Sequence, residues 1–222
     1  MNAIEIKNLH FSYGKENVLD GVSLCLKEGR LAILAGENGA GKSTFIEALA
    51  ICAGFNPEGG SPNLNYHTYD SHSSLFNDLK LVRSAYRNKD GYFLRAESFY
   101  NVSSELDRIS GRAFQMINYG GMLHEYSHGE SFLALVQNRL SGNGLFIFDE
   151  PESALSISSQ FRLLIRMKEL VDNKSQFIIA THSPILLSYP GADIYRITNN
   201  GFESVTYEET DQFKLTKYFI NN

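Results

Sequence analysis

The chain has 222 residues, of which 43% are hydrophobic and 20% are charged, and its formal net charge is −5. This length fits one domain, and the composition is that of an ordinary globular protein. The acidic balance argues against a basic sheath for nucleic acid, although a local basic groove is compatible with it. No apolar run approaches the roughly 18 residues that cross a bilayer, and no signal segment opens the chain, which predicts a cytoplasmic protein.

The first part of the chain predicts a hairpin followed by a strand and a helix. Apolar and polar residues alternate around Ile4 and again over 22–26, which indicates two half-buried strands joined through a turn near Gly14. The continuous apolar run 31–35 predicts a buried strand. Apolar residues at helical spacing predict a helix over 44–53.

The rest of the chain predicts an α/β arrangement. Residues 54–74 have the Gly, Pro, Asn and Ser content of a loop, and residues 75–140 are expected to be mainly helical. Short apolar runs at 145–148 and 177–180 suit parallel strands covered on both faces, and 157–171 has helical spacing. The remaining expected elements are strands at 194–197 and 205–207 and a short final helix.

Residues 36–43 read Gly-Glu-Asn-Gly-Ala-Gly-Lys-Ser and match the phosphate-binding loop G-x-x-x-x-G-K-[ST]. The loop lies between a predicted strand and a predicted helix, which is the context that the motif needs. Glycines let successive backbone N–H groups surround an anion, and the helix N-terminus adds its dipole. Lys42 is expected to reach the β- and γ-phosphates, and Ser43 to hold Mg²⁺. The predicted phosphate-binding residues are Gly36, Asn38, Gly39, Ala40, Gly41, Lys42, Ser43 and Thr44.

Two strands are predicted to end in further polar groups. Asp149 and Glu150 follow the run 146–148, so Asp149 is expected to orient Mg²⁺ and Glu150 to polarise the attacking water. His182 follows the next strand and is expected to contact a γ-phosphate or to hold the water-activating carboxylate. The alternatives are solvated acids and a satisfied histidine, but open α/β sheets bind ligands at this edge.

A second anion site is predicted near residue 127. Ser127 and Gly129 precede an apolar helical stretch at 132–140, and a small hydroxyl with a glycine suits a helix start that binds an anion. One nucleotide cannot use two such sites in one lobe. We therefore expect Ser127, Gly129 and Glu130 to bind the γ-phosphate held by another protomer; a plain helix N-cap is the alternative.

Taken in order, these motifs resemble the ATP-binding-cassette superfamily over nearly the whole chain. The resemblance implies a P-loop ATPase core of the ATP-binding-cassette type, with ATP and Mg²⁺ as ligands and an ATP-dependent homodimer. It implies that Tyr13 stacks on adenine, with turn packing as the alternative. The implied division is a single ATPase domain over 1–222, with a core lobe at 1–56 and 144–222 and a smaller helical signature lobe at 57–143.

The branch of this superfamily is indicated by departures from the transporter pattern. Transporter subunits usually have Leu-Ser-Gly-Gly-Gln where this chain has Tyr-Ser-His-Gly-Glu at 126–130. Residues 181–187 look like those of the soluble chromosome-maintenance, recombination and phage-defence ATPases. In that branch Glu97 stands where a metal-sensing Gln would be, which makes it a candidate metal ligand with Ser43 and Asp149. Ser156 stands where the family commonly has an Asp that communicates across the dimer.

The function expected on this basis is Mg²⁺-dependent ATP hydrolysis that closes and opens a homodimer. Lys42, Glu150 and His182 are the catalytic candidates. The cycle is expected to act as a soluble switch on a nucleic acid or a partner protein, in genome maintenance or phage defence. The alternatives are the nucleotide-binding subunit of a membrane transporter and an ATP-locked dimerisation module without turnover.

Three other groups of residues are not expected to form a functional site. Cys25 and Cys52 are expected to be small core residues. A metal site in the polar segment at 67–72 is disfavoured, because its residues have no regular ligand pattern. A loosely basic stretch is interpreted as a solvated helix face in preference to a nucleic-acid groove. These last two groups are His67, Tyr69, Asp70 and His72, and Lys80, Arg83, Arg87, Lys89 and Arg95.

Overall fold

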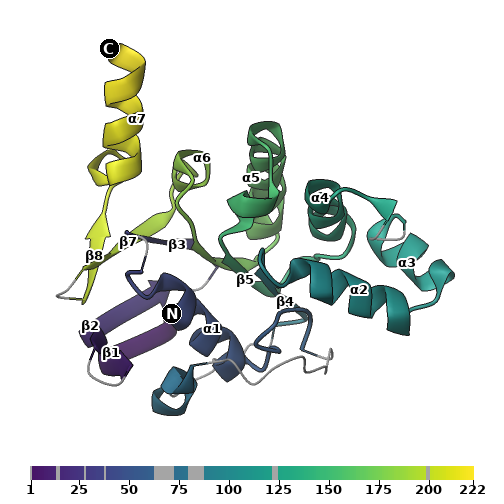
Figure 1. Ribbon diagram of the computed structural model, residues 1–222, viewed down its shortest axis with the longest axis horizontal. Helices are drawn as coiled ribbons and strands as arrows, with labels where there is room; N and C mark the ends of the chain where they lie inside the picture. The colour runs from purple at the N-terminus through teal and green to yellow at the C-terminus, as the bar shows by residue number, and fades with distance from the viewer. Residues whose placement is uncertain are drawn as a thin grey trace.

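The computed structural model describes residues 2–13, 16–27, 29–37, 39–62, 73–79, 88–121, 125–198 and 201–222. These residues form a two-stranded hairpin and a six-stranded sheet with helices on both faces (Figure 1). The strands are β1 (Asn2–Tyr13), β2 (Glu16–Lys27), β3 (Leu31–Ala35), β4 (Asp90–Arg95), β5 (Gly144–Asp149), β6 (Gln176–Ala180), β7 (Asp193–Thr198) and β8 (Gly201–Val205). The helices are α1 (Lys42–Ala53), α2 (Phe99–Ile109), α3 (Arg112–Tyr119), α4 (His128–Asn138), α5 (Ile157–Asp172), α6 (Pro184–Leu187) and α7 (Asp211–Asn221), with 3-10 turns η1 (Ser74–Asp78), η3 (Pro151–Ala154) and η4 (Tyr207–Glu209).

The larger sheet has the strand order β4-β5-β6-β3-β7-β8. Its first five strands are parallel, and β8 pairs with β7 in the antiparallel direction. Every residue of β3 and of β6 is buried, which explains the continuous apolar runs at 31–35 and 177–180. Because the strands are parallel, the chain leaves β3, β4, β5 and β6 at one edge of the sheet.

Two apolar cores cover the two faces of this sheet. Helices α4, α5 and α6 lie on one face, and α1 and the hairpin lie on the other (Figure 1). Successive residues of β5 point to opposite faces of the sheet. Phe146 and Phe148 pack in the core under α4 and α5. Ile147 packs in the other core with Phe45 and Ile46 of α1. Burial on both faces holds the strand ends, and therefore the side chains that follow them, in fixed positions.

The sequence-based elements are largely confirmed, with two corrections. The hairpin, the strands at 31–35, 145–148 and 177–180, and the helices at 44–53 and 157–171 are present. The expectation of a mainly helical 75–140 is wrong at β4, which pairs with β5 along its whole length. The predicted helical lobe at 57–143 therefore contains a strand of the core sheet. Residues 205–207 do not form a strand of their own, since β8 ends at Val205 and Tyr207 begins a 3-10 turn.

Candidate ATP site

The phosphate loop connects β3 to α1 at the carboxyl edge of the sheet. Gly39 and Gly41 adopt left-handed backbone angles, with φ of 81° and 83°, and Gly41 is the residue that precedes α1. A side chain is strained in this conformation, so the loop needs glycine at both positions. The predicted ligand Asn38 lies outside the described residues.

Lys42 is held inside this loop. The side chain is only 3% exposed, and its Nζ donates to the carbonyl oxygens of Gly36 at 3.0 Å and Glu37 at 2.7 Å. Burial lowers the pKa of Lys42, while the charges of Glu150 and Asp149 oppose that shift. The positive charge of Lys42 therefore lies within the loop, where the motif predicts that phosphates bind.

Ser43 and Asp149 meet across the sheet edge. The Ser43 Oγ donates to the Asp149 Oδ1 at 3.0 Å, although the residues are 106 positions apart in the chain. Burial raises the pKa of Asp149 to about 6, against the opposing effects of the Arg95 charge and the Ser43 hydrogen bond. A buried carboxylate oxygen beside a hydroxyl oxygen is a donor set that fits Mg²⁺.

The surroundings of this oxygen pair also fit a nucleotide-bound magnesium ion. Among the residues that the structure describes, no group of three or more His, Cys, Asp or Glu is arranged to hold a metal ion. Mg²⁺ commonly binds to one or two protein oxygens and takes its remaining ligands from phosphates and water. The site is thus suited to a metal that arrives with ATP.

Glu150 and His182 face each other at the ends of β5 and β6. Glu150 has a left-handed backbone, φ 47° and ψ 52°, and its N–H donates to the Ala180 carbonyl oxygen at 2.9 Å. Such a conformation is costly for a residue other than glycine and is typical of functional sites. The His182 Nε2 lies 3.3 Å from the Glu150 Oε1, but without hydrogen-bond alignment, so Nε2 is buried without a hydrogen-bond partner in the described part of the chain. The backbone N–H of His182 donates to the Glu152 Oε1 at 2.5 Å.

The segment around Ser127 is a helix cap that satisfies itself. Ser127 precedes α4, and its Oγ accepts from the Glu130 N–H at 3.4 Å, while the Glu130 Oε2 accepts from the Ser127 N–H at 3.0 Å. The Ser127 Oγ also donates to the Glu130 Oε2 at 2.6 Å, and this hydrogen bond, together with the one from the Ser127 N–H, lowers the pKa of Glu130. A Cβ on Gly129 would lie 2.8 Å from the Ala154 carbonyl oxygen, so packing against η3 requires a glycine there. The helix-cap alternative describes the observed contacts, and the role toward a second subunit stays a prediction.

The other predicted site residues occupy different surroundings. Tyr13 ends β1 and pairs with Glu16, but its side chain lies outside the described residues. The Glu97 side chain is 87% exposed, and its Oε2 is 4.0 Å from the Arg95 Nε. Ser156 precedes α5 and accepts a hydrogen bond from the Ser159 N–H at 3.3 Å. Serine thus caps this helix, as aspartate also does, but without the negative charge.

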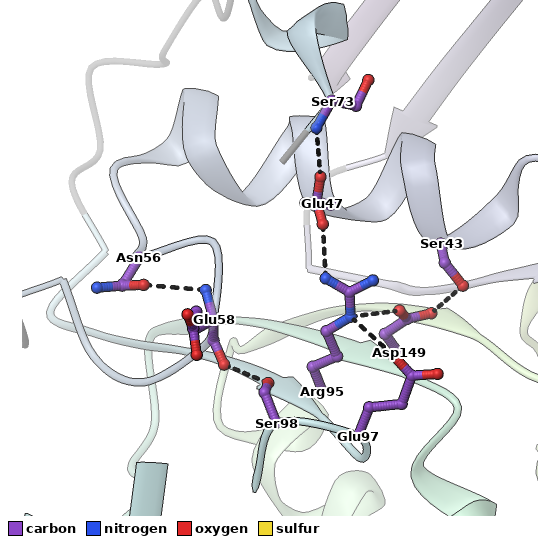
Figure 2. Close-up of polar contacts among 9 residues, drawn as sticks. All are labelled: Ser43, Glu47, Asn56, Glu58, Ser73, Arg95, Glu97, Ser98 and Asp149. Carbon is purple, nitrogen blue, oxygen red and sulfur yellow. Dashed lines mark hydrogen bonds and ion pairs between the residues drawn. The ribbon is translucent and has the colours of Figure 1, made fainter. Parts of the chain in front are cut away.

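Arg95 and Glu47 are site residues that the sequence interpretation missed. The placement of Arg95 on a solvated helix face is wrong, since it ends β4 and its NH1 lies 2.5 Å from the Glu47 Oε2 (Figure 2). Its Nε also lies 3.5 Å from the Asp149 Oδ2. The apolar run at 92–94, followed by a cation, is compatible with a strand end, but three apolar residues do not distinguish a strand from a helix.

Several interpretations concern residues that the structure does not describe or describes in part. Cys52 is half-buried, with its Sγ 3.4 Å from the Phe76 carbonyl oxygen, and burial raises the pKa of its thiol. The Cys25 side chain is not among those described. The positions that lie outside the described residues are Gly14, His67, Tyr69, Asp70, His72, Lys80, Arg83 and Arg87.

Comparison with known proteins places this geometry in a family. The family model described as "ABC transporter" matches residues 19–153, which is more than half of the chain. The chain belongs to the ATP-binding-cassette family. Members of this family are ATPases, so the predicted fold and enzyme class are confirmed. A second model, "AAA domain, putative AbiEii toxin, Type IV TA system", matches residues 131–188.

Individual relatives and solved structures agree with this assignment. The chain is 27% identical to an uncharacterized ABC transporter ATP-binding protein of Haemophilus influenzae, over 86% of this chain and 78% of the relative. It is 28% identical to the energy-coupling factor transporter ATP-binding protein EcfA1 of Fusobacterium nucleatum, over 81% of this chain and 73% of the relative. A nucleotide-free ATP-binding cassette from an ABC transporter has the same fold, with a TM-score of 0.56 and 18% identity over 98% of this chain and 96% of that structure.

A second solved structure has the same fold, with a comparable TM-score. It is cbiO1 from Clostridium perfringens, with a TM-score of 0.54 and 16% identity over 99% of this chain and 95% of that structure. The family's cofactor is ATP, which the phosphate loop suits. In the described part of the chain, the helices are too short or too polar to cross a membrane.

Proposed function

We propose that this protein is a Mg²⁺-dependent ATP hydrolase whose site is completed by a second copy of the chain. The observation that carries the proposal is the 3.0 Å contact between Ser43 and Asp149, which brings the phosphate loop to the acidic end of β5. It unites two motifs that are far apart in the sequence at one edge of the sheet, where α/β folds bind nucleotides. We propose a single ATPase domain for the whole chain.

Each group at this edge has a role in hydrolysis. Lys42 exchanges its two loop carbonyl partners for phosphate oxygens, since an ammonium is a stronger partner for an anion than for a neutral carbonyl. Ser43 and Asp149 would hold Mg²⁺, which neutralises phosphate charge when bound. Glu150 orients the water that attacks the γ-phosphorus and accepts its proton. The buried Nε2 of His182 is placed to hold the Glu150 carboxylate or to donate to the γ-phosphate.

The relatives favour a membrane-protein partner over the soluble switch that the sequence motifs suggested. EcfA1 is named as a transporter ATP-binding protein, and so is TcyN of Escherichia coli, in an L-cystine transport system. We therefore propose that hydrolysis drives a partner membrane protein.

The soluble switch on a nucleic acid or a partner protein is the second candidate. It is supported by the match of the "AAA domain, putative AbiEii toxin" model to residues 131–188. That segment includes Asp149, Glu150 and His182, and the sequence at 126–130 departs from the transporter signature beside it.

Phosphate release from ATP by the purified chain tests the enzymatic proposal. We expect release that needs added Mg²⁺ and that is lost in Lys42→Ala together with binding of fluorescent ATP, because this variant removes the charge that meets the phosphates. Lys168→Ala is the matched control, since Lys168 is an exposed lysine on α5 that pairs with Asp172. Unchanged nucleotide affinity in Lys42→Ala would contradict the assignment of the loop.

Co-purification separates the two partner classes. An ATP-trapped variant is captured from detergent-solubilised membranes and, in parallel, from the soluble fraction of the same cells. An integral membrane protein that raises the phosphate-release rate when it is added back supports the transporter role. Stimulation by DNA, RNA or a soluble protein instead supports the switch.

A further inference from the structure

Arg95 connects three elements of the ATP site through its guanidinium group. Figure 2 shows it between Glu47 of α1 and Asp149 at the end of β5, with Glu97 alongside. The NH1 atom lies 2.5 Å from the Glu47 Oε2, and the Nε atom lies 3.5 Å from the Asp149 Oδ2. The phosphate loop motif includes neither Arg95 nor Glu47.

The two oxygens of Asp149 have different partners. The Oδ1 atom accepts the hydrogen bond from Ser43, and the Oδ2 atom faces Arg95. Because a carboxylate is planar, a partner that fixes one oxygen also fixes the direction of the other. Arg95 is well placed for this, because it pairs with Asp149 in the strand register and the next backbone N–H, from Ala96, donates to the Asp149 carbonyl oxygen at 3.2 Å.

Glu47 holds Arg95 in turn. It is 7% exposed, and its second carboxylate oxygen accepts from the Ser73 N–H at 3.0 Å. Ser43 and Glu47 lie one turn apart on α1, so the same helix carries the hydroxyl at the metal position and the acid that holds the arginine. Because Glu47 and Arg95 have opposite charges, the pair has little net electrostatic effect on more distant groups. The main effect of the pair is therefore to orient Asp149.

We propose that Arg95, held by Glu47, is a positioning residue that turns the Asp149 Oδ1 toward Ser43 and the magnesium position. The inference rests on the proposed function, because the metal is expected to arrive with ATP. A planar guanidinium presents donors to two carboxylates at once, which a lysine ammonium on a flexible stem does less well.

Metal binding without turnover tests this role. Free Mn²⁺ is measured by electron paramagnetic resonance in the presence of the full chain and the non-hydrolysable imido analogue of ATP. Arg95→Gln is expected to weaken Mn²⁺ binding by about tenfold or more, because it releases the carboxylate ligand. Affinity for the same nucleotide in EDTA is expected to change by less than about twofold, since Lys42 and the loop are untouched.

Three variants separate positioning from charge and from folding. Arg139→Gln is the matched control: it breaks the Arg139–Asp90 pair at the opposite end of β4, where the side chains are 26% and 6% exposed, against 24% and 9% for Arg95 and Glu47. The double variant Glu47→Gln with Arg95→Gln removes both charges at constant net charge and is expected to weaken Mn²⁺ binding as Arg95→Gln does. Arg95→Lys keeps the charge and is expected to be intermediate.

The outcomes distinguish this inference from the proposed function. Weakened Mn²⁺ binding in Arg95→Gln and in the double variant, with Arg139→Gln at the wild-type value, supports the positioning role. Wild-type Mn²⁺ binding in Arg95→Gln, or an equal loss in Arg139→Gln, overturns it while the ATPase proposal stands. Wild-type protein that binds the nucleotide no better with Mn²⁺ than in EDTA overturns the metal-dependent function and this inference together. If Arg95→Gln does not fold, Glu47→Gln alone replaces it, with the same weakening expected and a wild-type value overturning the role.

Discussion

The sheet edge and the signature segment, residues 126–130, satisfy their polar groups in different ways. At the sheet edge, buried carboxylates pair with half-buried side chains that are distant in sequence, as Asp149 does with Ser43 and Glu47 with Arg95. At the signature segment, Ser127 and Glu130 are exposed and bond to each other three residues apart. The contacts at the sheet edge therefore depend on the folded sheet, whereas the Ser127–Glu130 hydrogen bonds form within the first turn of α4.

The part of the proposed site at the sheet edge is assembled within a single chain. Buried polar groups must find partners when the protein folds, so the residues at the sheet edge are already placed relative to one another. The signature residues face solvent and have given their hydrogen bonds to a local cap. The second subunit that we propose would therefore meet residues that already face solvent, and three experiments test this contrast.

The largest effect is expected at the sheet edge. Glu150→Gln should lower phosphate release by a factor of about 10²–10⁴, because it removes the base and keeps the shape of the side chain. Binding of Mg²⁺–ATP should persist, and light scattering should detect an ATP-bound dimer. Glu169→Gln, at an exposed glutamate of α5, is the control. Monomer at saturating ATP together with wild-type turnover would refute both the base assignment and the dimer.

An intermediate result is expected for Ser127→Arg. Its own phosphate loop is intact, so fluorescent-ATP affinity should stay near the wild-type value. Hydrolysis should collapse, because a bulky cation at the start of α4 blocks the facing site. Mixing with Lys42→Ala subunits should restore part of the activity, since one site then combines an intact loop with an intact Ser127. Full activity of Ser127→Arg alone would leave Ser127 as a helix cap only.

The smallest effect concerns the caps themselves. Ser127→Ala and Ser156→Ala each remove an N-cap hydroxyl and should each lower the free energy of unfolding by about 1 kcal/mol, as seen in urea titrations. Ser127→Ala should in addition reduce phosphate release under conditions where the protein is fully folded. Equal stability losses with unchanged hydrolysis in Ser127→Ala would indicate that Ser127 has no role beyond α4.

Much of the fold and of the candidate site could be predicted from local pattern. The phosphate loop, its strand and its helix are contiguous, so their order in the chain is their order in space. Asp149 and His182 follow unbroken apolar runs, and parallel strands bring such ends to one edge. Lys42, Ser43, Asp149 and Glu150 lie near one another in the structure, and their roles stay predictions.

The identity of β4 and the position of Arg95 follow only from how the strands and helices pack. Three apolar residues at 92–94 are too few to separate a strand from a helix by periodicity, and pairing with β5 makes them a strand. The partner of Arg95 on α1 is 48 residues away, a distance at which sequence pattern carries no information about contact. Local spacing encodes helices, loops and strand ends, whereas the neighbours of a buried charge are set by how the strands and helices pack.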